Sequence, residues 1–231
     1  FHSTRDSNLT SLADYKQRML GSQDAIYYII GEDPEIVARS PHLEGFRSRN
    51  IEVFLLTDPV DEFWVPSIGK FDDTPFKSIT QGDTDLSAIN VTDPEAKSKV
   101  APEGEVALLV ALLKQALEDH VKDVRVSERL TDSAVCLVAD SGDLDMHLAR
   151  LLKAHKQLDT LAPRILEINP THKLIRDLAA RAKEPGAPDR LNDAALLLVD
   201  QARILEGEAI PDPIAFSRRL SEVMGKSLAA E

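Results

Sequence analysis

The chain has 231 residues, which suits one large or two modest domains because a domain averages about 150 residues. Its 43% hydrophobic and 29% charged residues are typical of a soluble, helix-rich protein and exclude disordered and collagen-like classes. The formal net charge of −12 repels phosphate backbones, so nucleic acid is not an expected partner. No apolar run approaches the ~20 residues that cross a bilayer, so no membrane contact is expected, and the single cysteine, Cys136, fits a reducing cytoplasm.

Residues 1–85 are predicted to form a small α/β layer domain. The β-branched and aromatic runs at 25–30 and 51–56 are typical of strands. Each run is followed by an aspartate–proline pair, Asp33-Pro34 and Asp58-Pro59, in which the aspartate can cap a helix that begins with proline. The resulting order of helix, strand, helix, strand and helix predicts a parallel pair of strands.

The segment 86–104 is predicted to be a solvated linker, because it is rich in acidic and small polar residues and its apolar residues have no sustained period. A second domain of the α+β class is predicted over residues 105–231. Its apolar spacing predicts one helix at 106–117, three strands at 121–126, 134–138 and 165–168, and further helices at 143–155, 171–182, 189–205 and 213–228. The fold class is therefore α/β followed by α+β, with a three-stranded sheet and a terminal helix bundle.

None of the common sequence motifs of enzymes is present. The chain lacks a Walker phosphate loop, Gly-x-Gly-x-x-Gly, Gly-x-Ser-x-Gly and His-Glu-x-x-His. The two histidines that share a segment, His147 and His155, are two turns apart rather than at the spacing of metal ligands. Asp61 and Glu62 are adjacent and point about 100° apart on a helix, which favours a helix-dipole role over a converging pair. We therefore expect no catalytic residue, cofactor or metal site in this chain.

Three segments carry more apolar surface than a small domain needs. Phe63-Trp64-Val65 covers a wide arc of one short helix, so at least one of these side chains is expected to face solvent or a partner. The helix at 143–155 has a stripe of leucines with Met146 set off from it, and both core packing and partner binding are open for it.

The two last helices form the third apolar segment. Apolar residues surround almost the whole helix at 189–205 and follow one side of the helix at 213–228. A symmetric helix-bundle dimer would cover them. The predicted dimer interface consists of Leu191, Leu196, Leu197, Leu198, Leu205, Phe216, Leu220, Val223 and Met224.

Two ordered sets of short motifs run along the chain. The first is Ser11-Leu12-x-x-Tyr15-x-x-Arg18-Met19, Ile26-Tyr27-Tyr28-Ile29, Ser40-Pro41-His42-Leu43-Glu44, Ile51-Glu52-Val53 and Asp61-Glu62. The second is Val121-Lys122-Asp123-Val124-Arg125, Arg129-Leu130-Thr131-Asp132, Leu166-Glu167-Ile168-Asn169-Pro170-x-His172 and the segment 196–205. The first set closely resembles the end of the middle domain, and the second the C-terminal dimerisation domain, of the bacterial ninety-kilodalton heat-shock chaperone family.

The resemblance implies a C-terminal fragment of an ATP-dependent chaperone of the stress response, cytoplasmic and homodimeric, which binds unfolded proteins and assists their folding. In the family the ATP-binding domain and a catalytic arginine lie in other parts of the protein, so ATP and Mg²⁺ are expected only in the full-length protein. The chain ends at 226–231 without the acidic Met-Glu-Glu-Val-Asp tail, so repeat-domain co-chaperones are not expected to bind there.

The resemblance also implies which residues contact clients. The family's tryptophan position falls on Phe63, with Trp64 one step later, so either aromatic is a candidate. The implied client-binding residues are Glu62, Phe63, Trp64, Leu144, Met146, Leu148, Leu151 and Leu152. The alternative function is a dimeric scaffold or adaptor that binds one specific partner through its apolar helices.

Overall fold

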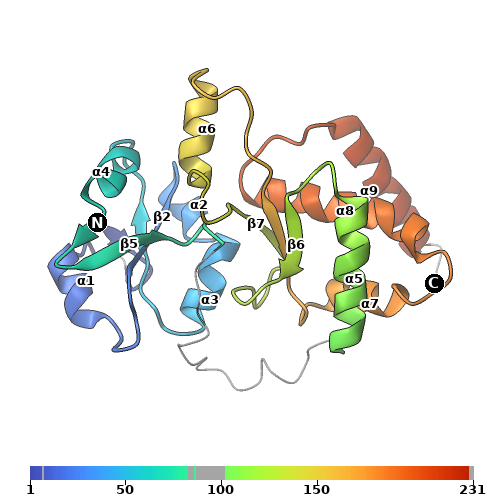
Figure 1. Cartoon of the computed structure of the whole chain (residues 1–231), viewed down its shortest axis with the longest axis horizontal. Helices are drawn as coiled ribbons and strands as arrows, with labels where there is room; N and C mark the ends of the chain where they lie inside the picture. The colour runs from blue at the N-terminus through green and yellow to red at the C-terminus, as the bar shows by residue number, and fades with distance from the viewer. Residues whose placement is uncertain (7, 83–85, 87–101, 229–231) are drawn as a thin grey trace. The chain divides into compact units, whose positions relative to one another are not determined.

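The computed structural model describes residues 1–6, 8–82, 86 and 102–228 (Figure 1). The chain divides into two compact units: unit 1 holds residues 1–98, 128–132 and 138–164, and unit 2 holds residues 99–127, 133–137 and 165–231. The sequence predicts a second domain over 105–231, whereas the contacts group 128–132 and 138–164 with the N-terminal part. The predicted linker at 86–104 lies outside the described residues except for residue 86 and residues 102–104.

The sheet of unit 1 has five strands in the order β1 (His2–Ser3), β3 (Phe54–Leu56), β2 (Ile26–Ile30), β5 (Thr74–Ser78) and β4 (Lys70–Phe71). β2 runs parallel to both β3 and β5, which confirms the predicted parallel pair. β1 and β4 pair antiparallel with β3 and β5, at the two edges. β1, β4 and β5 were not predicted, because two-residue strands leave no periodic pattern and the proline in β5 weakens a strand prediction.

Unit 1 has a hydrophobic core on each face of this sheet. Successive side chains of a strand point to opposite faces, so Tyr27 and Ile29 enter one buried cluster while Ile26, Tyr28 and Ile30 enter the other. The helical segments of this unit are α1 (Leu12–Arg18), α2 (Pro34–Val37), the 3₁₀ turn η1 (Pro41–Leu43), α3 (Glu44–Arg47), α4 (Asp61–Ile68) and α6 (Met146–Ala154).

One of the two predicted helix starts is confirmed in unit 1. The Asp33 side chain caps α2 by accepting hydrogen bonds from the first-turn N–H groups, as expected. The predicted start at Asp58-Pro59 is wrong, because α4 begins at Asp61 and has no side-chain cap. The Asp61 carboxylate instead accepts a hydrogen bond from the Asp58 N–H at 3.0 Å, so this aspartate–proline pair forms a turn before the helix.

The segment 128–132 packs onto unit 1 through polar contacts. The Arg129 guanidinium donates hydrogen bonds to the carbonyl oxygens of Ile79 and, at 3.1 Å, of Gln81. The Glu44 carboxylate accepts the backbone N–H groups of residues 131 and 132 at 2.7 and 2.9 Å. Two of the motifs behind the family resemblance, at 40–44 and 129–132, therefore contact each other within one unit.

Gly45 is expected to be irreplaceable at this contact. A Cβ atom at this position would come within 2.7 Å of the Arg129 Cα. Helix propensity alone predicts that Gly45→Ala stabilises the protein, whereas the clash predicts a loss of about 1–3 kcal/mol in the free energy of unfolding. Urea unfolding distinguishes the two, with Gly21→Ala as the control because no atom lies within 4 Å of a Cβ there. Equal stability of both variants would contradict the prediction.

Unit 2 combines a three-stranded sheet with helices, as predicted. The strands β6 (Asp123–Val126), β8 (Ile165–Ile168) and β7 (Val135–Val138) lie in that order, and β6 is parallel to β8. The helices are α5 (Glu103–Ala116), α7 (Lys173–Arg181), α8 (Ala187–Leu205) and α9 (Pro213–Leu228), and α5 packs against α7 and α8. Within the part of the chain that the structure describes, no helix is both long and apolar enough to cross a bilayer.

A buried carboxylate lies in the middle of the unit 2 sheet. Glu167 on β8 is almost inaccessible to solvent. Its carboxylate accepts hydrogen bonds from the Arg125 guanidinium at 2.7 and 3.1 Å and from the Ser127 hydroxyl at 2.8 Å. Because a buried charge is tolerated only when it is paired and hydrogen-bonded, these bonds stabilise the pairing of β8 with the β6 segment.

Candidate functional site

The predicted client-binding residues lie on two helices of unit 1 that contact each other. Glu62, Phe63 and Trp64 belong to α4, whereas the remaining five lie on α6 or in the turn before it (Figure 1). The two helices meet where the Glu62 carboxylate pairs with Nδ1 of His147. The structure therefore brings two predicted segments together that are far apart in the sequence.

The three apolar residues of α4 have different environments. Val65 is buried in the core, Trp64 is half-buried and Phe63 is 59% exposed. The Trp64 ring packs against Phe76, and its indole N–H donates to the Asp61 carboxylate at 2.5 Å. The expectation that at least one of the three faces solvent is confirmed by Phe63. Phe63 is also the more accessible of the two candidate aromatics, because Trp64 is held by its neighbours.

The carboxylates of α4 are in its first turn, as expected, and both are buried. Tyr28 on β2 lies near Glu62 and near Asp145, the residue before α6. Burial raises the pKa of the Tyr28 hydroxyl, and the negative charges of Asp145 and Glu62 raise this pKa further. Tyr28 therefore stays neutral beside the carboxylates of Asp145 and Glu62. The first turns of α4 and α6 thus share one buried polar region next to β2.

The start of α6 is fixed by Asp145. One carboxylate oxygen accepts the backbone N–H of His147 at 2.9 Å, which caps the helix. The other accepts hydrogen bonds from the hydroxyls of Ser78 and, at 2.7 Å, of Thr80, just past the end of β5. The helix therefore begins at Met146 rather than at 143. An aspartate before an apolar helix is a recognisable cap, but its distant hydroxyl partners leave no signal in the sequence.

The apolar side chains of α6 differ in exposure. Leu144, just before the helix, is 45% exposed, and the side chains of Leu148, Leu151 and Leu152 are half-buried. Met146, which was expected to be presented to a partner, is instead 1% exposed, because it lies in the first turn and faces inward. The accessible part of this helix is therefore formed by leucines.

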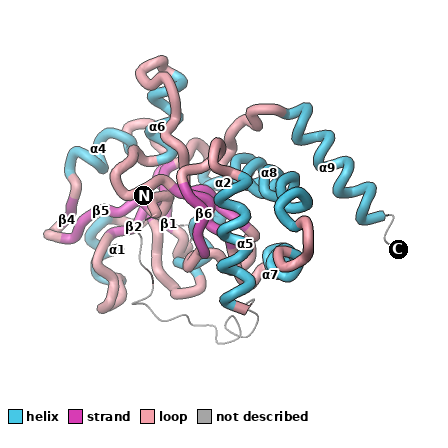
Figure 2. The backbone as a smooth tube through the Cα atoms, turned by 45° about the vertical axis from the view of Figure 1, so that its right-hand side comes forward, coloured by secondary structure: helices cyan, strands magenta, loops and turns pink. Residues whose placement is uncertain are grey.

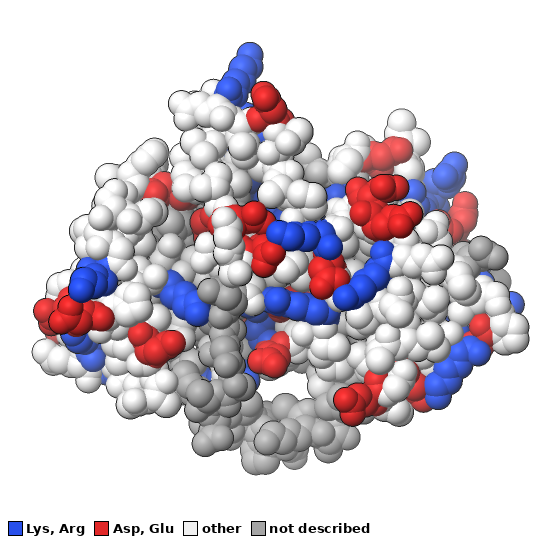
Figure 3. All heavy atoms as spheres, viewed as in Figure 1, with Lys and Arg blue, Asp and Glu red and all other residues white. Residues whose placement is uncertain are grey.

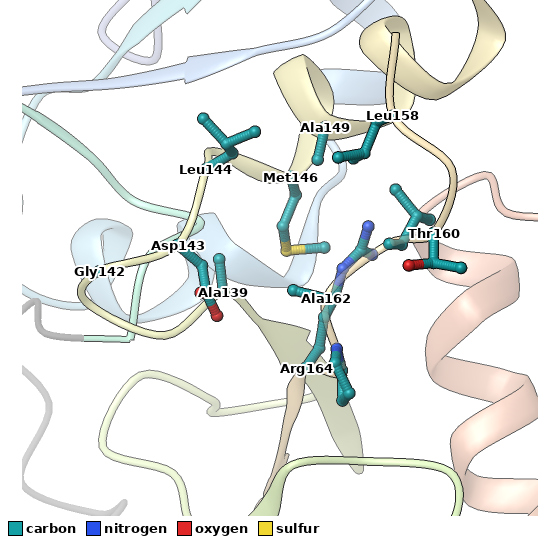
Figure 4. Close-up of a pocket in the computed structure, with 12 residues that line it drawn as sticks. Ala139, Gly142, Asp143, Leu144, Met146, Ala149, Leu158, Thr160, Ala162 and Arg164 are labelled. Carbon is teal, nitrogen blue, oxygen red and sulfur yellow. The ribbon is translucent and has the colours of Figure 1, made fainter. Parts of the chain in front are cut away.

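A pocket of about 410 Å³ lies between α6 and the segment 158–164. Figure 4 shows the Met146 side chain pointing into this pocket towards Ala162 and Arg164. Leu144 and Leu158 contribute further apolar lining, whereas Asp143, Thr160 and Arg164 supply polar groups. A cavity of this size and lining can hold an apolar side chain or a small apolar ligand. Among the described residues, no group of three or more His, Cys, Asp or Glu could hold a metal ion.

Charged side chains do not form one large patch on the face shown in Figure 3. Acidic and basic groups are interspersed there, and much of the surface of α6 is uncharged. A mostly uncharged, leucine-bearing surface favours contact with apolar groups over recognition of a single strongly charged partner.

The predicted dimer residues separate into two groups within unit 2. On α8, Leu191 and Leu198 are buried in the interior of the unit, Leu196 and Leu197 are half-buried, and Leu205 is exposed. On α9, no described side chain between 213 and 226 is buried, and Figure 2 shows this helix extending beyond α8. Its apolar stripe consists of Phe216, Leu220, Val223 and Met224. Most of the predicted interface is therefore accessible on the single chain.

Comparisons with known proteins agree on one family. The family model described as Hsp90 protein matches residues 1–231. Three bacterial relatives named chaperone protein HtpG are similar over 99% of this chain: 50% identical in Paramagnetospirillum magneticum, 52% in Roseobacter denitrificans and 49% in Rhodospirillum rubrum. The chain spans 37% of the length of each of these relatives.

Proposed function

Since this chain belongs to the Hsp90 family of chaperones, we propose that it is the client-binding and dimerising part of an ATP-dependent chaperone that assists the folding of non-native proteins. The main support is the exposure of Phe63 on α4 and of Leu144 just before α6, because these two helices contact each other in unit 1. If these side chains form one contiguous apolar patch, it has the character of an interaction surface.

The proposed clients are polypeptide segments that expose apolar side chains. Leu148, Leu151 and Leu152 are half-buried on α6, so each offers part of its surface to a partner. The adjacent pocket, with Met146 at its wall, offers space for one inserted apolar side chain. Such contacts depend on apolar area rather than on a fixed pattern of hydrogen bonds, which suits binding of many different clients.

The proposal assigns nucleotide chemistry to other parts of the full-length protein. As the family resemblance implies, ATP and Mg²⁺ would act there, and this chain would carry no cofactor of its own. The lack of a phosphate-binding loop in the sequence supports this assignment. We also propose a cytoplasmic homodimer, in which the exposed stripe of α9 pairs with that of a second copy.

Replacing the exposed apolar residues tests client binding. Phe63→Ser and Leu144→Ser are expected to weaken the suppression of aggregation of an unrelated unfolded protein, measured by light scattering. The melting temperature should change little, because surface substitutions usually cost less than about 0.5 kcal/mol. Met146→Ser should instead lose about 2–5 kcal/mol of stability, because its side chain is buried.

Ile36→Ser is the matched control, because Ile36 is exposed on α2, outside the proposed surface. The proposal is contradicted if Phe63→Ser and Leu144→Ser suppress aggregation as well as the Ile36→Ser control does. Repeating the assay with several unrelated unfolded proteins separates a chaperone from a scaffold, since a scaffold would bind one partner and suppress no aggregation.

A further inference from the structure

We propose that His147 and Asp145 are positioning residues for client binding, which hold α6 against α4 so that the two helices present one apolar surface. This inference rests on the proposed function and concerns the same surface. Neither residue belongs to the predicted client-binding set, and neither has an apolar side chain to offer a client. Their role follows from the groups with which they pair.

The first contact is between His147 and Glu62. The Glu62 side chain is 2% exposed and that of His147 is 16% exposed, so the pair is largely removed from water. In the described part of the chain, His147 is the only hydrogen-bond partner of the Glu62 carboxylate. Moving α6 away from α4 would leave this carboxylate buried and unsatisfied, which is unfavourable. The pair therefore opposes separation of the two helices.

The second contact fixes the same end of α6 to the sheet. Both carboxylate oxygens of Asp145 are used, one by the backbone N–H of His147 and the other by the hydroxyls of Ser78 and Thr80. Ser78 and Thr80 are themselves buried, so they do not follow α6 if it moves. The first turn of α6 is thus held by α4 and by the end of β5, whereas residues 153–157 at its other end are exposed.

Holding α6 in place acts on client affinity. A client that contacts both Phe63 and the leucines of α6 binds only molecules in which the two helices are together. If α6 detaches part of the time, the apparent dissociation constant rises by the inverse of the competent fraction. The amount bound at saturation stays the same, because each chain still has one complete surface when α6 is in place. Rescue distinguishes a hydrogen-bonding role from space filling, because His147→Gln keeps a donor for Glu62 whereas His147→Leu does not.

The test uses the full chain with four single variants. Labelled lactalbumin, reduced and carboxymethylated so that it stays unfolded, is the client probe in a fluorescence-anisotropy titration. Amide hydrogen exchange of residues 146–154 is measured without the probe. The variants are His147→Leu, His147→Gln, Thr80→Val and, as a control, Lys70→Ala, which removes the exposed Lys70–Asp73 ion pair of the same unit.

His147→Leu is expected to raise the dissociation constant of the probe about tenfold, equivalent to about 1.4 kcal/mol, with unchanged signal at saturation. Exchange in α6 should become faster while β2 and β3 stay protected. His147→Gln should retain most of the affinity, because its amide can donate to Glu62. Thr80→Val should weaken binding in the same direction as His147→Leu, because Asp145 loses one hydrogen bond. Lys70→Ala should behave like the unmodified chain.

The inference is overturned if His147→Leu leaves the dissociation constant and the exchange of α6 unchanged, or if His147→Gln is as impaired as His147→Leu. Should His147→Leu unfold the unit, unchanged affinity and exchange in Thr80→Val overturn it equally. A different result, in which the unmodified chain does not bind the probe, refutes the proposed function. Hydrogen exchange still shows in that case whether His147 and Asp145 hold α6.

Discussion

Leu220→Asp is expected to convert a dimer of this chain into monomers by raising the dissociation constant at least about a hundredfold, or about 2.7 kcal/mol. Leu220 is 40% exposed on α9, and Val223 and Met224 of the same stripe are exposed as well in the described part of the chain. In the separate chain the new carboxylate remains in water. In a helix-bundle dimer it would be buried among apolar side chains, which costs several kcal/mol.

Two controls distinguish dissociation from unfolding. Arg218→Asp changes the charge more strongly, but Arg218 is exposed on the opposite side of α9, so the dimer should persist. Leu198→Asp should unfold unit 2, because Leu198 is 2% exposed within the chain itself. Sedimentation velocity at micromolar concentration measures the oligomeric state of Leu220→Asp and Arg218→Asp. Circular dichroism measures the folding of Leu198→Asp. If the unmodified chain sediments as a monomer, or Arg218→Asp dissociates like Leu220→Asp, the proposed interface is wrong.

Glu167→Ala is expected to lower the free energy of unfolding of unit 2 by about 3 kcal/mol, the low end of the ~3–5 kcal/mol lost when one partner of a buried ion pair is removed. The low end applies because the Arg125 side chain is 37% exposed and water can reach it once Glu167 is gone. The buried Ser127 hydroxyl would also lose its hydrogen bond to Glu167.

Urea unfolding followed by fluorescence and circular dichroism measures this loss. Glu167→Gln should lose less, because the amide oxygen can still accept from Arg125 and the amide NH2 can donate to the Ser127 hydroxyl, which then acts as the acceptor. Lys173→Ala is the control for an exposed pair, Lys173–Asp177 on α7, and should cost less than about 1 kcal/mol. A loss from Glu167→Ala no larger than that from Lys173→Ala would show that the buried pair does not stabilise the sheet.

The sequence by itself determined the elements that have a clear local pattern. The strand at 165–168 and the helix at 213–228 have the predicted bounds. The strand is a short β-branched run that ends at Asn169-Pro170, and the helix begins at Asp212-Pro213 with a helical apolar period. The apolar excess of α9 was also visible, since a helix stripe depends on spacing alone. The family resemblance came from the same source, because its motifs are short and local.

Only the tertiary structure decided which of the predicted site residues are accessible to a partner and which are buried. Leu144 and Met146 are two residues apart, yet one is exposed and the other is buried, because the cap at Asp145 sets where α6 begins and so which side faces inward. The pairing of Glu62 with His147 joins residues 85 positions apart. Such contacts depend on how the chain folds back on itself, and no local spacing of residue types records them.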